Sequence, residues 1–275
     1  MSTYFVGDIH GCFKQLKNLL NKVSFNFKKD TLWVTGDLVS KGPNSIEVLN
    51  FLYSNKKSIK IVLGNHDLNL IRLYFENILF PDKNNNFKNS DYNFKSLRCI
   101  IDWLRKQPIF RVNLKKKFVI SHSGIPPKWG INLSKHYSNL IKKILSSNNY
   151  KKIFYILNMM FVNNCKWNNC LENKNNIKFA INGFTRMRYC VKKTYDLDLE
   201  YKNFPPENYK KNLIPWFLTK NKIPKKFSII FGHWSSLNGE GVPKNFYAMD
   251  TGCCKGNKLT MLRWEDKKKF YESFY

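Results

Sequence analysis

The stretch VGDIHG, residues Val6 to Gly11, places an aspartate, a histidine and two glycines directly after a short apolar run. Taken alone, such a stretch indicates a turn, because glycine and aspartate are common turn residues. Two later stretches repeat the arrangement, GDLVSKG at 36–42 and GNHD at 64–67, and each again follows an apolar run. The spacing of the three stretches suggests a common structural cause.

The first third of the chain alternates between strand-like and helix-like patterns. Three strands and three helices are predicted in alternation, at 3–7, 12–23, 31–37, 43–53, 59–65 and 68–79. Asp8, Asp37 and Asn65 lie 29 and 28 residues apart, about the length of one strand-helix unit. Successive parallel strands would bring these side chains to the carboxyl edge of one sheet, where α/β proteins bind ligands.

Two later apolar runs end in the same way. Strands are predicted at 118–121 and 228–232, and they are followed by His122 and His233. The five strand ends therefore gather one polar set: Asp8, His10, Asp37, Asn65, His66, Asp67, His122 and His233. The remaining histidine, His136, falls in a predicted polar helix and is expected on the surface.

The rest of the chain has a less regular pattern. A helix is predicted at 133–145, and two late strands are predicted at 246–249 and 259–263. The polar segments 81–93 and 163–178 are expected to be exposed loops, and 204–224 is expected to be irregular. Since no internal repeat or linker is apparent, we expect a single domain over residues 1–275.

Composition restricts the function classes. The formal charge is +28, but only seven of the 47 basic residues are arginine. Evenly spread lysine indicates a solvated surface, whereas nucleic-acid binders often use arginine; a basic field would still attract an anionic substrate. No transmembrane run or signal-peptide pattern is apparent. The seven cysteines do not form a zinc-like pattern, so we expect reduced thiols, a cytoplasmic location and no membrane partner.

The polar set has the chemistry of a metal site. Carboxylate, imidazole and amide donors without cysteine suit Mn²⁺, Fe, Co²⁺ or catalytic Zn²⁺ better than a structural zinc ion. Six or so donors exceed the needs of one tetrahedral ion, so two ions that share an aspartate fit better. Such pairs lie about 3.5–4 Å apart and act in displacement reactions at phosphorus.

The motifs GDIHG, GDLVSKG, GNHD, SHSG and GHW resemble those of the calcineurin-like metallophosphoesterases, in the phosphoprotein-phosphatase branch. The stretches NGFTRMRYC, FGHWSSLNGEG and MDTGCCKGNKLTMLRWED are similar to the bacterial symmetrical diadenosine tetraphosphatases, so the resemblance covers nearly the whole chain. It implies an α/β metallophosphoesterase fold, with two mixed β-sheets packed as a sandwich and flanked by helices. It also implies hydrolysis of diadenosine tetraphosphate (Ap4A) to two ADP, activated by two divalent ions, Mn²⁺ or Co²⁺. Related dinucleoside polyphosphates and tetraphosphate caps on RNA 5′ ends would be further substrates.

The resemblance also implies roles for the polar residues. Asp8 and His10 would bind the first ion, and Asp37 would bridge the two. The second ion would take three further ligands, Asn65, His122 and His233. His66 would protonate the leaving oxygen while Asp67 orients its imidazole. The residue pattern alone leaves open that His66 is another metal ligand.

Phosphate oxygens and the adenine base need further partners. Arg186 is the leading phosphate candidate, because a guanidinium can bind two oxygens, and Arg188 is either a second candidate or a packing residue. Lys41 stands where the related enzymes usually carry arginine, which keeps the charge but loses the fork. Trp234 and Trp216 are candidates for base stacking, although aromatic residues more often belong to the core.

Two alternatives stay open at this stage. A Ser/Thr protein phosphatase of the same superfamily would share the metal site, but GDLVSKG lacks the Asp-Arg pair common in that branch. A basic RNA-binding protein without turnover is supported by the +28 charge, yet binding alone would not need His66 or Asp67. The sequence gives no prediction of the oligomeric state.

Overall fold

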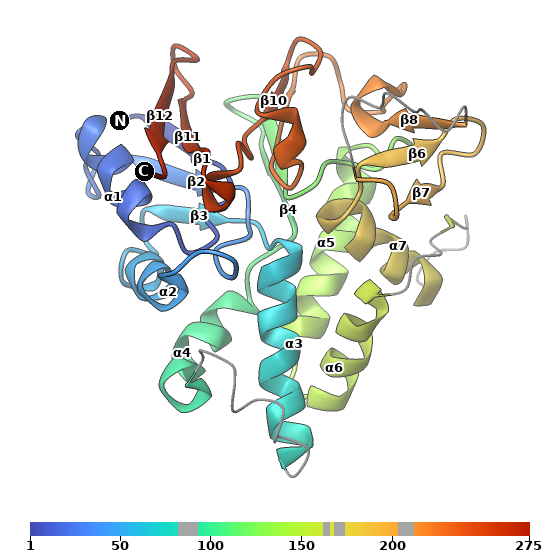
Figure 1. Ribbon diagram of the computed structural model, residues 1–275. Coiled ribbons are helices and arrows are strands. Elements are labelled where there is room, and N and C mark those ends of the chain that lie inside the picture. The colour runs from blue at the N-terminus through green and yellow to red at the C-terminus, as the bar shows by residue number, and fades with distance from the viewer. Residues whose placement is uncertain (82–92, 162–165, 168–173, 203–211) are drawn as a thin grey trace.

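The computed structural model describes residues 1–81, 93–161, 166–167, 174–202 and 212–275 (Figure 1). Its strands are β1 (Thr3–Val6), β2 (Thr31–Val34), β3 (Ile59–Ile61), β4 (Phe110–Asn113), β5 (Phe118–Ser121), β6 (Tyr189–Val191), β7 (Leu197–Asp198), β8 (Leu213–Pro215), β9 (Ser228–Phe231), β10 (Phe246–Ala248), β11 (Lys258–Arg263) and β12 (Lys269–Ser273). Its α-helices are α1 (Phe13–Lys22), α2 (Ser45–Ser54), α3 (Asn65–Leu79), α4 (Phe94–Leu104), α5 (Ile131–Leu145), α6 (Tyr150–Asn158) and α7 (Lys174–Thr185).

The first sheet contains the three strands that the spacing predicted. Its order is β12-β11-β1-β2-β3, and β1, β2 and β3 run parallel while β11 and β12 pair antiparallel. The predicted alternation of strands and helices over 3–79 is therefore confirmed. As a result, the chain leaves β1, β2 and β3 at the same edge of the sheet.

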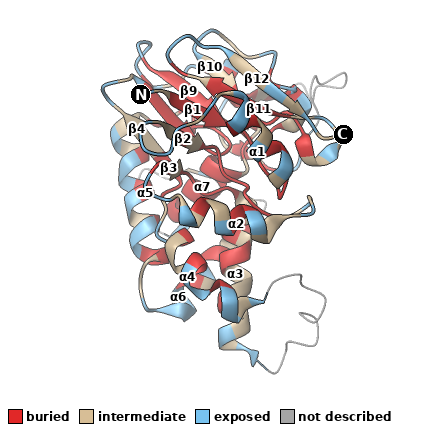
Figure 2. Ribbon diagram, turned by 90° about the vertical axis from the view of Figure 1, so that its left-hand side faces the viewer, coloured by how far each residue is buried: buried red, intermediate tan, exposed pale blue. Residues whose placement is uncertain are grey.

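The second sheet has the order β10-β9-β5-β4, with β5, β9 and β10 parallel and β4 antiparallel. The two sheets pack face to face through aromatic side chains. The Phe5 and Trp33 rings of the first sheet each lie 4.9 Å from the Phe118 ring of the second. Tyr4 and Val6, which alternate with Phe5, join the other core cluster with the helices. The predicted sandwich of two mixed sheets is confirmed, and its inner strands β1, β5 and β9 are buried along their whole length (Figure 2).

A third, smaller sheet, β7-β6-β8, was not predicted. It lies beside α7, at the right of Figure 1, while α3, α4, α5 and α6 form a helical layer below the sheets. The long helix α3 packs against α6 and α4, and α7 packs against α5. Helix α3 starts just beyond the carboxyl end of β3, so the helical layer begins at the edge where the parallel strands end.

Several predicted boundaries need correction. Helix α3 begins at Asn65 and not at 68, because the chain turns through Gly64 and Asp67 accepts its N–H at the helix start. The segment 163–178 is no loop over 174–178, because α7 begins at Lys174 and buries Ile177. The predicted irregular segment 204–224 contains β8 and a short 3₁₀ turn at Trp216–Leu218. Most of the remaining predicted loop residues, 82–92, 163–165, 168–173 and 204–211, lie outside the described residues.

Two smaller expectations can be compared directly with the structure. His136 is exposed on α5, as predicted for a surface histidine. Among the described residues, no helix is long and apolar enough to cross a membrane.

Candidate dinuclear metal site

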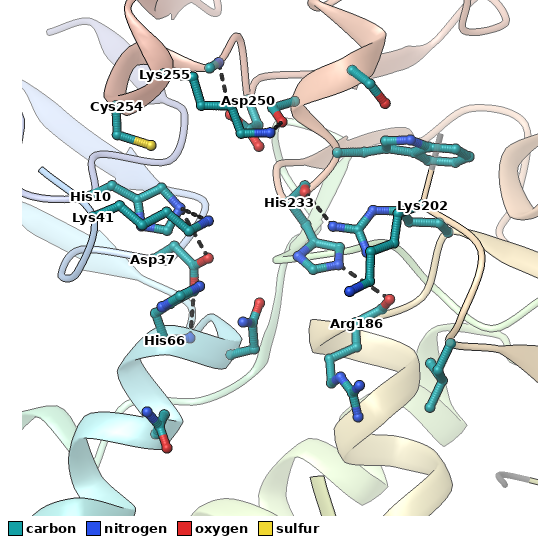
Figure 3. A pocket seen from close by; sticks show the side chains of 18 of the residues that line it. His10, Asp37, Lys41, His66, Arg186, Lys202, His233, Asp250, Cys254 and Lys255 are labelled. Carbon is teal, nitrogen blue, oxygen red and sulfur yellow. Dashed lines mark hydrogen bonds and ion pairs between the residues drawn. The ribbon is translucent and has the colours of Figure 1, made fainter. Parts of the chain in front are cut away.

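The predicted polar residues converge at one place because the strands that precede them are parallel. Asp8 and His10 follow β1, Asp37 follows β2, and Asn65 starts α3 just beyond β3. From the second sheet, His122 follows β5 and His233 follows β9. Figure 3 shows His10, Asp37 and His66 on one side of a cavity and His233 on the other.

Asp37 is the centre of this arrangement. Its Oδ2 lies 3.4 Å from His10 Nε2 and 3.3 Å from His122 Nε2, so one carboxylate oxygen faces two imidazoles. Its Oδ1 accepts a hydrogen bond from the backbone N–H of His66 at 2.9 Å. Asp37 therefore occupies the position that a shared ligand between two ions requires.

The ring orientations of the two histidines indicate that a cation belongs between them and Asp37. His10 Nδ1 lies 2.9 Å from the Val39 carbonyl, and His122 Nδ1 lies 2.8 Å from the Thr35 carbonyl. A carbonyl only accepts, so Nδ1 carries the proton and the lone pair of a neutral ring lies on Nε2. Each Nε2 lone pair then faces a carboxylate oxygen, a contact that a proton or a metal ion must mediate.

Two sets of donor atoms lie within metal-binding distance of one another. One set is His10, Asp37 and His66, the other is Asp37, His122 and His233, and the ligand atoms of each lie within 4.8 Å. Asn65 Oδ1 adds an oxygen 3.2 Å from His122 Nε2. The donor set therefore fits two divalent ions that share Asp37, with nitrogen and oxygen ligands only.

Asp8 lies beside both sets and belongs to neither by this distance. Its Oδ1 accepts a hydrogen bond from Thr35 Oγ1 at 3.0 Å and lies 3.9 Å from His122 Nδ1. Its Oδ2 accepts the backbone N–H of His233 at 2.9 Å. Asp8 thus already connects the first sheet to the His233 loop, and its place as a ligand remains a prediction.

Several residues of the site have a left-handed backbone conformation although they are not glycine. His10, Asp37, Lys41 and His233 all have positive φ, between 45° and 65°, which L residues rarely adopt. A Cβ at Gly64 would collide with the Asp37 carboxylate. Packing of the parallel strand ends therefore holds several of the predicted ligands in uncommon geometry.

Burial and neighbouring charges shift the pKa values of the buried carboxyl and imidazole groups at this centre. Burial and the neighbouring Asp250 raise the pKa of Asp8 well above its usual range. Burial alone would raise the pKa of Asp37 too, but His122 and His10 hold it well below its usual range. Burial would lower the pKa of His122, yet Asp37 and Asp8 raise it to about 9. The buried carboxylates thus favour positive charge at this centre, which is the role of a divalent ion.

Asp250 was not among the predicted ligands. It follows β10, which runs parallel to β9, so it reaches the same sheet edge as His233. Its side chain is buried and lines the cavity, and its Oδ1 accepts the Gly252 N–H at 3.0 Å. The signal for it was the same as for the other residues, a polar side chain directly after an apolar strand.

His66 stands at the start of α3 and lines the cavity. Its ring lies edge-on to the His10 ring, with centroids 4.9 Å apart. Burial lowers the pKa of His66, and the Asp37 carboxylate acts in the opposite direction. A lowered pKa makes the imidazolium a stronger acid. The geometry allows His66 either role that the sequence left open, proton donor or metal ligand.

The predicted role of Asp67 needs correction. Its Oδ2 accepts the backbone N–H groups of Asp37 and Gly64, and its Oδ1 accepts that of Leu38, each at 2.9 Å. Among the described residues, no hydrogen bond joins Asp67 to the His66 ring. Because Asp67 is fully buried, its carboxylate holds the loop that carries Asp37 and does not orient the imidazole.

Replacing Asp67 by alanine is therefore expected to act on stability as well as on activity. Three buried N–H groups would lose their acceptor, so the free energy of unfolding should fall by about 3 kcal/mol or more. Chemical denaturation of the metal-free protein measures this change. An Asp67→Ala protein with unchanged stability and lost activity would instead support the original role at His66.

The cationic residues lie around the same cavity. Lys41 Nζ is 3.3 Å from His10 Nε2. Arg186 Nη1 donates to the Met160 carbonyl and, at 3.0 Å, to Asn182 Oδ1, whereas its own carbonyl lies 3.2 Å from His233 Nε2.

Arg188 Nη2 donates to the His233 carbonyl at 3.1 Å. Burial lowers the pKa of Arg188 to about 10, and the carboxylates of Asp250, Asp37 and Asp8 oppose this shift. Arg188 therefore lines the cavity in the electrostatic field of these carboxylates, and its role as a phosphate ligand stays a prediction.

Trp216 and Trp234, the two candidates for base stacking, are both buried. Trp216 is fully buried, contacts Phe231, and does not line the cavity, so it cannot stack on a base there. It fills the space beside Gly124, where any Cβ would collide with its ring. Trp234 lines the cavity but is only 2% exposed, because its ring packs against Tyr189 and Phe217. Both rings belong to the core, as the general preference of aromatic residues favoured.

The cavity has a volume of about 510 Å³ and contains residues that sequence reasoning missed. They are Asn69, Met160, Phe161, Leu199, Lys202 and Lys255. Lys202 and Lys255 add positive charge on the sides of the cavity opposite and above His66 (Figure 3). A cavity that combines buried carboxylates and imidazoles with a rim of cations suits a polyanion bound through metal ions.

Comparison with known proteins agrees with this chemistry. Residues 1–155 match the family model described as calcineurin-like phosphoesterase. A symmetrical bis(5′-nucleosyl)-tetraphosphatase of Buchnera aphidicola subsp. Schizaphis graminum is 48% identical over 275 residues, covering 100% of this chain and 98% of that protein. The protein of the same name from Proteus mirabilis is 44% identical, covering 99% of this chain and 97% of its own.

Solved structures show the same fold. A crystal structure of a candidate diadenosine tetraphosphatase matches with a TM-score of 0.66 at 22% identity, covering 100% of this chain and 94% of that one. With a matching family model over more than half of its length and full-length relatives above 40% identity, the chain belongs to the calcineurin-like phosphoesterases, in the family of the symmetrical bis(5′-nucleosyl)-tetraphosphatases.

Proposed function

We propose that this protein hydrolyses Ap4A symmetrically to two ADP. The observation that carries the proposal is the position of Asp37, shared between two sets of ligand atoms at a cavity rimmed by cations. The names of the full-length relatives support the substrate class. Other dinucleoside polyphosphates and RNA 5′ ends with tetraphosphate caps are proposed as further substrates of the same centre.

The proposed cofactor is a pair of divalent ions, Mn²⁺ or Co²⁺. The residues that would hold them are Asp8, His10, Asp37, Asn65, His122 and His233. Such ions, when bound, offset the charge of the phosphates and activate water as a nucleophile. The oxygen and nitrogen donors, without cysteine, support this choice of metal.

The chain's own residues would complete the reaction. His66 would give its proton to the oxygen that leaves with the second ADP, since it lines the cavity beside Asp37. Lys41, Arg186 and Arg188 would bind non-bridging phosphate oxygens. The coupling of Arg188 to the carboxylates of the metal site supports its place next to the reacting phosphate.

Two properties of the whole chain belong to the same proposal. We place the enzyme in the cytoplasm, which the free thiols of the five described cysteines support. We treat 1–275 as a single domain, which is supported by a core cluster with members from Tyr4 to Met261.

Product analysis tests the proposed function. The metal-stripped protein would be incubated with Ap4A, with and without Mn²⁺ or Co²⁺, and the nucleotides separated by ion-exchange chromatography. ADP as the only product, formed only with metal, is the expected result. Formation of AMP and ATP would contradict symmetric cleavage. Absence of turnover, together with dephosphorylation of a phosphoprotein or metal-independent binding of RNA, would favour one of the alternatives.

Lys41 offers a quantitative test of phosphate binding. In Lys41→Arg the guanidinium can donate two hydrogen bonds where the ammonium acts as a point charge. One further hydrogen bond of about 1 kcal/mol corresponds to an increase in kcat/KM for Ap4A of about fivefold. Steady-state kinetics of Lys41→Arg and Lys41→Ala would measure it. Equal kcat/KM values in all three proteins would show that residue 41 does not contact the substrate.

A further inference from the structure

The two tryptophans nearest the metal site do not provide a base-binding surface. Trp216 is outside the cavity and Trp234 is 2% exposed, so neither presents a ring face to a ligand. Phe161 also lines the cavity, and its side chain is 56% exposed. It ends the short 3₁₀ helix η2 (Met159–Phe161), which follows α6. Among the described residues that line the cavity, Phe161 is the one with an exposed apolar aromatic ring.

The exposed ring of Phe161 is supported by α3. The Arg72 guanidinium lies over it, 5.2 Å from the ring centroid. Arg72 is itself fixed, because its Nε donates to Asn69 Oδ1 at 3.1 Å and its Nη1 donates to Glu76 Oε2 at 2.7 Å. A ring that is exposed and yet held by a fixed cation is a preorganised platform for a planar ligand.

The same short helix is connected to the phosphate side of the cavity. The Met160 carbonyl accepts a hydrogen bond from Arg186 Nη1, and both residues line the cavity. Arg186 also donates to Asn182 Oδ1 on α7 at 3.0 Å. Arg186, which is proposed to bind phosphate, thus contacts Met160, the residue that precedes Phe161.

Helix α3 links Phe161 to the reaction centre, because Arg72 contacts the Phe161 ring and His66 lies on the same helix. His66 and Asn69 are three residues apart on α3 and both line the cavity, and Arg72 follows three residues later, turned further around the helix axis. At 1.5 Å per residue, Arg72 lies about 9 Å along the axis from His66. A nucleoside diphosphate whose terminal oxygen meets His66 extends over a comparable length toward its base.

We propose that Phe161 is the stacking platform for the purine base of the leaving nucleoside diphosphate. The proposal rests on the proposed function, because the assignment of His66 as proton donor to the leaving oxygen sets the direction of the ligand along α3. The base would lie against the exposed ring of Phe161, its phosphates would face Lys41 and Arg186, and the Asn69 amide would line its edge. Phe161 would then determine the preference for nucleoside-bearing polyphosphates over inorganic ones.

Binding of ADP and of inorganic pyrophosphate to the Mn²⁺-loaded protein tests this proposal without requiring turnover. In Phe161→Leu, which keeps an apolar side chain but removes the aromatic face, the Kd of ADP measured by calorimetry should rise about tenfold. The Kd of pyrophosphate should stay unchanged, and Phe161→Tyr should bind both ligands as the wild type does. Tyr155→Leu is the matched control, because Tyr155 is 53% exposed on α6 and does not line the cavity.

An unchanged Kd of ADP in Phe161→Leu would overturn the proposal. So would an equal rise in both dissociation constants, because it would indicate damage to the phosphate side and not loss of stacking. Failure of the proposed function is recognised separately, as a wild-type protein that binds ADP more tightly than pyrophosphate but releases no ADP from Ap4A. A selective effect of Phe161→Leu on ADP, accompanied by a similar rise in KM for Ap4A, would confirm the platform.

Discussion

His66→Ala is expected to lower kcat for Ap4A by about 10²- to 10⁴-fold while the protein keeps two metal ions. The physical reason is that general acid catalysis of this size is lost when the leaving oxygen departs without a proton. His66 lines the cavity beside Asp37, whose Oδ1 accepts its backbone N–H. Steady-state kinetics give kcat, and elemental analysis of the protein gives the metal content.

The metal content separates the two roles that the structure allows for His66. His66 belongs to the ligand-atom set with His10 and Asp37, so a metal-binding role would appear as the loss of one ion in His66→Ala. A substrate with a good leaving group, such as an aryl phosphodiester, adds a second criterion. Its turnover should be much less affected, because its leaving oxygen needs no proton. His136→Ala, on the exposed face of α5, is the control and should behave as the wild type.

Asp37→Asn is the second change for which a large loss of activity is expected. The amide would remove the charged oxygen that faces both His10 Nε2 and His122 Nε2 at 3.3–3.4 Å. Because a metal pair contributes several kcal/mol of charge stabilisation in the transition state, kcat/KM should fall by about 10³-fold or more. The metal content should fall below two ions per chain, which distinguishes this change from His66→Ala.

The control for Asp37→Asn removes a carboxylate elsewhere. Asp266 forms an exposed ion pair with Arg263, so Asp266→Asn should leave activity and metal content unchanged. Circular dichroism would establish that Asp37→Asn is folded. A folded Asp37→Asn protein with two ions and near wild-type activity would contradict the shared-ligand role of Asp37.

The sequence predicted that these polar side chains converge because they directly follow strands. A short apolar run that ends in a polar residue is a local signal, and parallel strands turn it into a spatial one. Asp250, which follows β10, carries the same signal, but it is absent from the predicted set of ligands. Asp67 shows the limit of local reasoning. In the described part of the chain, no hydrogen bond joins its carboxylate to the ring of its neighbour His66, but the carboxylate accepts the backbone N–H of Asp37, 30 residues away.

Helices α4, α6 and α7 and the small sheet were missed for a different reason. In α7 the buried residues Ile177, Ala180, Ile181 and Phe184 have regular helical spacing, but asparagine-rich flanks made the segment resemble a loop. The two-residue strand β7 and the three-residue strands β6 and β8 are too short to carry a period. Phe161 carried no local signal at all, because its exposure depends on how η2, α3 and α7 meet.

Two divalent ions are proposed to share Asp37 at the carboxyl ends of the parallel strands. Anomalous diffraction from a crystal of the Mn²⁺-loaded protein, collected at the manganese edge, tests this arrangement most directly. We expect two anomalous peaks about 3.5–4 Å apart, both within bonding distance of the Asp37 carboxylate. A single peak, or two peaks of which only one contacts Asp37, would contradict the account.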